Sequence, residues 1–293
     1  MADLVIKPAP STGNKLILQT QNGTAALTTS DAGVDSATSI VATKTGTETL
    51  TNKTLEVTTL SNVTGLSRNE GLVCKYVNGT TVDIDADYLT LFDSSNFAYI
   101  ASSVNLTAAI TASGINGLDT GSEATSTWYH IYVIYNGTTV ASLLSVSATS
   151  PTMPSGYTYK KYVGAVYNDS GDDFDIFHQL GNSVAKDVTS FEVTTTTLGS
   201  YNVLVACPPT AKRCAGYMQS SDDSGDDTLE IRIASDANGL GECRVFDNAV
   251  GARTIRGYFN VAFLTANTVW ASESAAGDPS NFLISQYFYE DIV

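Results

Sequence analysis

The segment WYHIYVIYNGTTVASLLSVSA (128–148) decides the fold class. Its first eight residues place mainly apolar side chains on both faces of an extended chain, as expected for a strand buried on both sides. The dipeptide Asn136-Gly137 then supplies a tight turn, and VASLLSVSA (140–148) follows as the return strand. The segment therefore predicts a β-hairpin in the centre of a sandwich.

Similar runs rich in Val, Ile, Tyr, Phe and Thr lie on both sides of this hairpin. Upstream are TVDIDADYLTLF (81–92) and FAYIASSVNLTAAI (97–110). Downstream, YKKYVGAVYND (159–169) and FDIFHQL (174–180) are predicted to pair as a second hairpin around SGDD. Residues 69–187 are therefore expected to form a first β-sandwich of six to eight strands.

Residues 188–293 show the same pattern. Eight strand-like runs extend from VTSFEVTTTTL (188–198) to FLISQYFYEDIV (282–293), separated by turn signals. Nowhere does a stretch of a dozen residues combine helical apolar spacing with a capping box. The predicted fold class is all-β: an extended N-terminal arm and a Thr-rich stalk, followed by two β-sandwich or jelly-roll-like domains.

Residues 1–35 form the predicted arm. The short apolar runs DLVI (3–6) and KLILQT (15–20) indicate a strand, a turn and a strand, too little to fold alone. Such an arm gains order by packing on a larger partner, and the side chains expected to anchor it are Leu4, Ile6, Leu16 and Leu18. A disordered tail is the alternative interpretation.

Residues 36–68 form the predicted stalk, which contains KTGTETLTNKTLEV (44–57). Threonine favours extended backbone. The chain leaves only a narrow apolar edge, formed by Leu50, Leu55, Val57 and Leu60. Two or three chains wrapped together would bury that edge jointly, whereas a single chain would leave the segment as a flexible linker.

Charge limits the partners. The chain has 30 acidic and 15 basic residues and a net charge of −15, so nucleic acid and anionic membranes are predicted to be poor partners. No apolar run approaches the roughly 20 residues that span a bilayer, so membrane insertion is not expected. The N-terminus MADLVIKPAP lacks the pattern of a secretory signal, which predicts synthesis in a cytosol.

The residues that usually carry chemistry are sparse. The two histidines, His130 and His178, lie inside apolar strand-like runs, and no nucleophile elbow or phosphate-binding glycine loop is present. The spacing of Cys74, Cys207, Cys214 and Cys243 does not match a zinc motif; free thiols are expected, with a Cys207–Cys214 bridge as the alternative. No catalytic residue, metal or cofactor is predicted, and calcium at the acidic clusters DSGDD (169–173) and SDDSGDD (221–227) stays an open question.

Aromatic residues offer another kind of site. The chain contains 15 tyrosines and two tryptophans, and most of these rings, Trp128 among them, are expected in the core. Rings near loops are candidates for stacking on a receptor. We expect Tyr157 and Tyr159, in SGYTYKKY (155–162), and Trp270, in NTVWASES (267–274), to be such receptor-binding residues.

Two stretches carry a resemblance to known proteins. GTETLTNKTL (46–55), with IKPAPSTGNKLILQTQNGTAAL (6–27) before it, resembles a pattern of tail-fibre and other appendage proteins of tailed bacteriophages. The block from 118 to 166, which includes WYHIYVIYN and SPTMPSGYTYKKYVGAV, looks like a β-module of phage structural proteins. Together they cover about half of the chain, and residues 188–293 show no such resemblance.

The resemblance implies a homotrimeric virion protein, attached by its N-terminus to a phage capsid or tail protein, with its β domains outward toward a host surface glycan or protein. Such a protein is assembled in the bacterial cytoplasm and displayed on the virion surface. Within this class a tail fibre competes with a capsid-bound head fibre or decoration protein. From a different class comes a secreted glycan-binding or glycan-hydrolysing module, which would carry an export signal.

Overall fold

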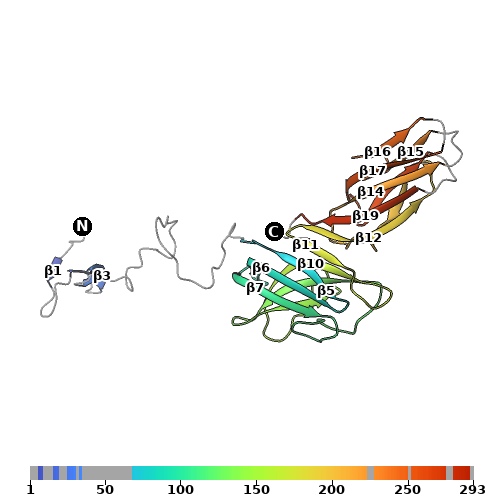
Figure 1. Ribbon diagram of the computed structural model, residues 1–293. Coiled ribbons are helices and arrows are strands. Elements are labelled where there is room, and N and C mark those ends of the chain that lie inside the picture. Colours follow the sequence, from blue (N-terminus) through green and yellow to red (C-terminus); the bar gives the residue numbers. More distant parts are fainter. Residues whose placement is uncertain are drawn as a thin grey trace. The chain divides into compact units, whose positions relative to one another are not determined.

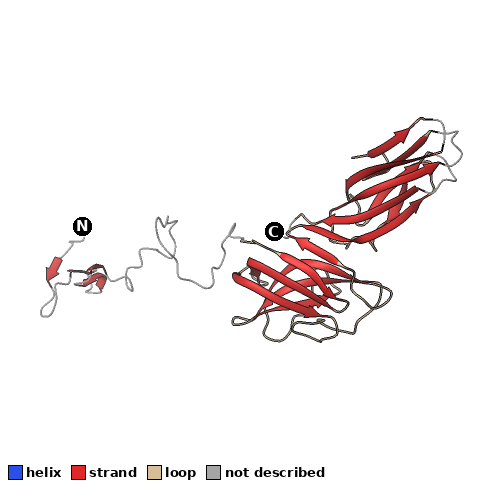
Figure 2. Cartoon of the chain, in the orientation of Figure 1, coloured by secondary structure: helices blue, strands red, loops and turns tan. Residues whose placement is uncertain are grey.

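The computed structural model describes residues 6–8, 16–19, 25–30, 33–34, 68–222, 228–249, 252–274 and 280–290. All regular elements in these ranges are strands (Figure 2), which confirms the predicted all-β class. Accordingly, this part of the chain contains no helix that is long and apolar enough to cross a membrane. The chain divides into two compact units, Met1–Glu56 and Val57–Val293, and each is described by itself.

The N-terminal unit contains a small antiparallel sheet in the order β1-β2-β3-β4. Its strands are β1 (Ile6–Pro8), β2 (Leu16–Gln19), β3 (Ala25–Ser30) and β4 (Gly33–Val34). Three anchoring candidates lie in paired strands, with Ile6 opposite Leu18 and Leu16 opposite Pro8. The fourth, Leu4, and all four stalk candidates (Leu50, Leu55, Val57 and Leu60) lie outside the described residues.

The second unit begins with seven strands that share one antiparallel sheet. They are β5 (Val73–Asn78), β6 (Thr81–Phe92), β7 (Ala98–Ala109), β8 (Thr127–Tyr135), β9 (Val140–Ser145), β10 (Tyr159–Asn168) and β11 (Phe177–Leu180). They are ordered β11-β5-β6-β10-β8-β9, and β7 pairs with β6. Ser142 Oγ in β9 donates to the Thr107 carbonyl in β7 at 2.6 Å, which links two strands from opposite parts of the sheet.

The β8–β9 pair confirms the predicted hairpin, but β9 stands at the end of the strand order rather than in its centre. Tyr135 pairs with Val140 across the turn, and the residues of β8 from 128 to 134 are all buried. One face of β8, with Tyr129 and Ile131, belongs to the main core. The other face, with Tyr132, forms a second apolar cluster with β9 and the segment that follows it.

The predicted second hairpin is wrong. β10 pairs along its whole length with β8, whereas β11 pairs with β5 on one side and with the following strand on the other. The segments that were expected to pair, 159–169 and 174–180, are joined only by the isolated bridge between Asn168 and Phe174. β8 occupies one edge of β10 along its whole length, and the chain turns at 169–173 into β11, whose residues from His178 to Leu180 pair with the distant strand β5 while Phe177 pairs with Lys186 of the next strand.

The described residues of the C-terminal part of the second unit contain eight strands, the number of strand-like runs predicted. They are β12 (Ser183–Val193), β13 (Gly199–Asn202), β14 (Arg213–Asp222), β15 (Leu229–Ala234), β16 (Cys243–Asp247), β17 (Arg253–Ala262), β18 (Thr268–Glu273) and β19 (Ser280–Phe288). Four of them form the sheet order β17-β14-β19-β12, which continues through β11 into the preceding strands (Figure 1). The other four form a separate sheet, β13-β18-β15-β16.

A shared core joins these strands. One apolar cluster contains buried residues from both sheets: Met218 and Phe282 from the first, and Ile231 and Val269 from the second. That cluster also includes Trp128, as predicted, whose Nε1 donates to the Leu204 carbonyl at 2.6 Å. Strand β12 runs across the boundary between residues 187 and 188 that the sequence suggested, so the residues on both sides of it share backbone hydrogen bonds as well as a core.

Candidate ligand-binding surface

The three predicted receptor-binding residues are not brought together. Tyr157 is only 7% exposed and packs in the cluster beside Tyr132. Tyr159 is half-buried near the ring of Tyr135, with ring centroids 5.9 Å apart. Trp270 is half-buried in β18, which belongs to the separate four-stranded sheet.

The histidines occupy strands. His130 is buried in β8, its Nδ1 lies 3.4 Å from Tyr162 Oη, and burial lowers its pKa to about 4. His178 is exposed on β11. Among the residues that the structure describes, no group of three or more His, Cys, Asp or Glu side chains is placed to hold a metal ion.

The acidic cluster at 169–173 is organised by its own backbone. The Asp169 carboxylate accepts hydrogen bonds from the N–H groups of Gly171 (2.6 Å) and Asp173 (3.2 Å). Asp169 therefore has a structural role in this turn, which explains its presence there without a bound ligand. Of the other cluster, residues 223–227 lie outside the described residues.

All four cysteines are thiols, as the sequence favoured. Cys207 and Cys214 are both buried, and a hydrogen bond between their side chains, together with burial, raises the pKa of Cys214 well above its usual value. The Cys214 thiol is therefore held in the neutral form, in which it is a poor nucleophile.

A surface of a different kind lies on the outer face of β14 and β17. Side chains alternate between the two faces of a strand, so Met218 and Phe259 point into the core while their neighbours point outward. In this register Tyr217 stands directly opposite Tyr258, and the next outward pair is Gln219 opposite Arg256. We call these four side chains the tyrosine-arginine surface.

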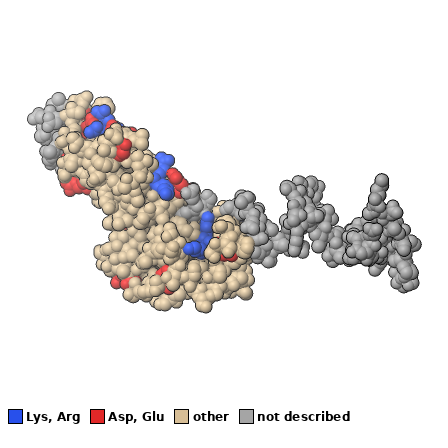
Figure 3. Space-filling view, turned by 180° about the vertical axis from the view of Figure 1, so that it is seen from behind, with Lys and Arg blue, Asp and Glu red and all other residues tan. Residues whose placement is uncertain are grey.

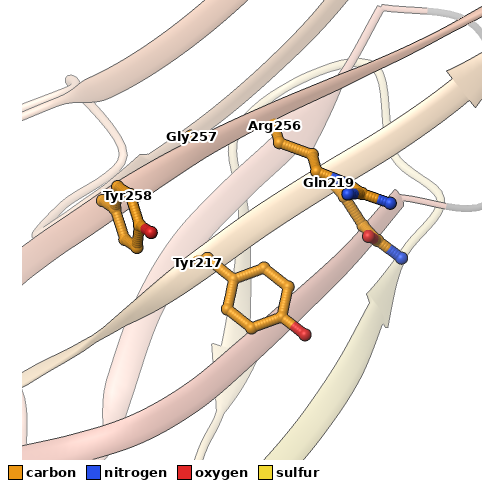
Figure 4. Close-up of a pocket in the computed structure, with 5 residues that line it drawn as sticks. All are labelled: Tyr217, Gln219, Arg256, Gly257 and Tyr258. Atoms are coloured by element: carbon orange, nitrogen blue, oxygen red, sulfur yellow. The ribbon is translucent and has the colours of Figure 1, made fainter.

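The tyrosine-arginine surface lines an open depression of about 370 Å³. Figure 4 shows its four side chains extending from the two neighbouring strands. Tyr258 is 89% exposed, Arg256 is exposed, and Tyr217 and Gln219 are half-buried. No described residue forms an ion pair with Arg256, so its guanidinium is accessible to a ligand.

Gly257 allows the second sheet to pack closely against the strand that carries the depression. It lies between Arg256 and Tyr258 and belongs to the inward face of β17. A Cβ at this position would overlap the side chain of Val245 on β16. Glycine therefore lets the two sheets approach closely beneath the site, which fixes the backbone that carries both outward side chains.

The surroundings are mostly uncharged and able to form hydrogen bonds. Across β14 and β19, Tyr217 pairs with Leu283 and Gln219 with Asn281. Towards the start of β14, Arg213 Nε donates to Asn260 Oδ1 at 3.1 Å. Figure 3 shows that uncharged side chains also dominate the face drawn there, with charged ones in small separate groups.

Sequence reasoning missed this surface. Tyr217 lies in CAGYMQSS (214–221) and Tyr258 in RTIRGYFNVAF (253–263), both of which were recognised as strands. Alternation about Met218 and Phe259 would have placed both tyrosines on outward faces. The pairing of two strands about 40 residues apart carries no local signal, so their meeting was not predictable.

No protein-family model matches the chain, and no curated protein matches it.

Proposed function

We propose that this chain is a non-enzymatic structural protein of a tailed-bacteriophage virion. It is a homotrimeric fibre or knob, anchored by residues 1–35 to a phage capsid or tail protein and involved in attachment to the host surface. It is assembled in the bacterial cytoplasm and displayed on the virion surface. The resemblance of residues 6–55 and 118–166 to phage appendage proteins motivates this proposal.

The observation that carries the proposal furthest is the strand order of the C-terminal part. Naming β12 to β19 as B to I, the two sheets read G-D-I-B and C-H-E-F. We infer from this order a jelly roll, an eight-stranded double-sheet architecture common to viral capsid and lectin domains. Because one fold hosts many functions, the order supports a virion role without defining the ligand.

The N-terminal unit supports the anchoring role. Its four strands are short, and the register pairs Ile6 with Leu18, two of the residues expected to contact the virion. A small sheet of this kind buries little apolar surface of its own and gains stability by adding to a larger partner.

The state of the reactive groups favours a structural role over catalysis. His130 is buried with a pKa near 4, so at neutral pH it is an uncharged core residue away from solvent. The Cys214 thiol is buried, and its pKa is raised well above its usual value. A general base must reach the proton it takes and have a pKa near the working pH; His130 and Cys214 meet neither condition, whereas His178 is exposed on β11.

The solution mass tests the proposal. Full-length chain and a truncated chain that begins at residue 69 are compared by sedimentation equilibrium at micromolar concentration. We expect a trimer for the full chain and a monomer for the truncation, because residues 36–68 provide the shared stalk. A monomeric full-length chain contradicts the homotrimer.

Copy number in purified particles separates the two virion roles. Protein bands are compared with the major capsid protein of the same particle. A handful of copies supports a tail fibre, whereas many copies support the capsid-bound head fibre or decoration protein. Absence from particles contradicts both.

A further inference from the structure

We propose that the tyrosine-arginine surface binds an acidic oligosaccharide, a chain of sugar rings that carry carboxylates. This assignment rests on the proposed role in host-surface attachment and names the class of ligand. It is carried by the depression itself, by the exposed ring of Tyr258 and by the accessible guanidinium of Arg256.

The aromatic part of the surface suits a sugar ring. One face of a pyranose carries mainly C–H groups, which pack against the flat face of an aromatic ring. The strand register places Tyr217 and Tyr258 directly opposite each other, so adjacent sugar rings would each find an aromatic neighbour. A ring left 89% exposed adds little to the core, so its place on the surface calls for another explanation.

The polar part of the surface suits hydroxyls and a carboxylate. The Gln219 amide offers one acceptor and two donors, the set needed for neighbouring sugar hydroxyls. Arg256, directly opposite Gln219, presents a planar guanidinium that pairs with a carboxylate through two parallel hydrogen bonds. No ion pair to another described side chain engages it, and its side chain is exposed, so it can reach a ligand.

Size and local charge agree with this ligand. The depression of about 370 Å³ falls within the usual range for small-molecule sites, roughly 300–1,000 Å³. The net charge of −15 opposes an anionic ligand at long range, but salt screens charges beyond about 10 Å, so the attraction for a carboxylate comes from Arg256 at the surface itself. The carboxylate of Glu192 lies on β12 and is separated from Gln219 by the whole of β19.

Calorimetric titration of the full-length protein tests the assignment. The probes are trigalacturonate, α2,8-trisialate and the methyl ester of each, which keeps the rings but removes the charge. The variants are Tyr258→Thr and Arg256→Gln. Phe246→Thr is the matched control, because this ring is also exposed, at 58%, but lies on β16 in the other sheet.

We expect saturable binding of at least one acid, with its methyl ester weaker by about tenfold or more, the value of a charge-assisted hydrogen bond. Arg256→Gln should weaken binding of the acid by a similar factor and leave binding of the ester unchanged. Tyr258→Thr should weaken binding of both the acid and the ester, and Phe246→Thr should change the binding of neither. Equal binding of acid and ester, unchanged binding by both site variants, or no binding of either acid at millimolar concentration overturns the proposal.

The outcomes separate this proposal from the virion role. The site substitutions lie outside the arm and stalk, so the trimer mass should be unchanged in every variant. A trimer that fails to bind acids overturns the site alone. A monomer that binds them through Arg256 overturns the oligomeric arrangement alone.

Discussion

Two pairs of tyrosines in this protein stand directly opposite each other on neighbouring antiparallel strands and differ in what covers them. Tyr132 faces Tyr162 across β8 and β10, and Tyr217 faces Tyr258 across β14 and β17. The first pair is an edge-on contact with ring centroids 5.6 Å apart, and Tyr132 is 2% exposed. In the second pair, Tyr258 is 89% exposed.

The two pairs differ in exposure because a segment outside the paired strands covers the first pair. After β9 the chain returns over the outer face of β8, where Tyr157 packs on the first pair and the Ser147 carbonyl accepts a hydrogen bond from Tyr132 Oη at 2.9 Å. Tyr162 Oη lies 2.7 Å from Thr210 Oγ1. Around Tyr258 the depression remains open. Cross-strand pairing thus brings tyrosines together, and the covering segment decides whether they become core or surface.

The largest effect is expected from truncating the covered pair. Tyr132→Ala removes a buried ring and leaves a cavity between β8 and the segment after β9, so the free energy of unfolding should fall by about 3–5 kcal/mol. Urea denaturation measures the change. Tyr132→Phe is the control, because it keeps the ring and loses only the hydrogen bond to Ser147, about 1 kcal/mol. Equal losses in both variants would mean that packing around the ring contributes little.

A smaller change in the free energy of unfolding is expected from His130, next to the covered pair, when the pH is lowered. The folded pKa of His130 is about 4, below its usual value of 6.5, so the unfolded chain binds the proton more tightly. Stability therefore falls as the pH drops below about 6.5, by about 2 kcal/mol between pH 7 and pH 4.5 from this group.

Urea unfolding at the two pH values measures that contribution. His130→Gln should lose about 2 kcal/mol less than the unmodified chain between pH 7 and pH 4.5. His178→Gln is the matched control, since His178 is exposed on β11. Identical acid losses in the unmodified chain and His130→Gln would assign the pH dependence to other groups.

Much of the fold follows from local patterns. The alternation in TVDIDADYLTLF (81–92) and the turn at Asn136-Gly137 are local signals, and both produced the predicted strands. The partner of β10 was missed because hairpin prediction favours the next strand in sequence. Here β10 pairs along its whole length with β8, whereas β11 pairs with the distant β5 on one side and forms a hairpin with the next strand, β12, on the other.

The site was harder to predict than the fold for a related reason. Tyr157 lies in SGYTYKKY (155–162), a loop-like stretch with Ser and Gly, yet it folds back against Tyr132 and is buried. Tyr258 lies inside an apolar strand-like run and is exposed. Exposure of an aromatic residue depends on what returns over it, which is a non-local contact, so proximity to a loop was a poor guide.

The smallest effect is expected from the open pair. Tyr258→Thr removes the exposed ring but keeps a β-branched residue that suits a strand, so the free energy of unfolding should change by less than about 0.5 kcal/mol. Urea denaturation at pH 7, beside Tyr132→Ala, measures the contrast between the two pairs. A loss above roughly 2 kcal/mol would show that the Tyr258 ring is covered in solution, for example by another copy of the chain, and would remove the basis for an accessible ligand surface. An unchanged stability together with weakened acid binding would instead separate the two pairs by role, one holding the fold and the other available to a ligand.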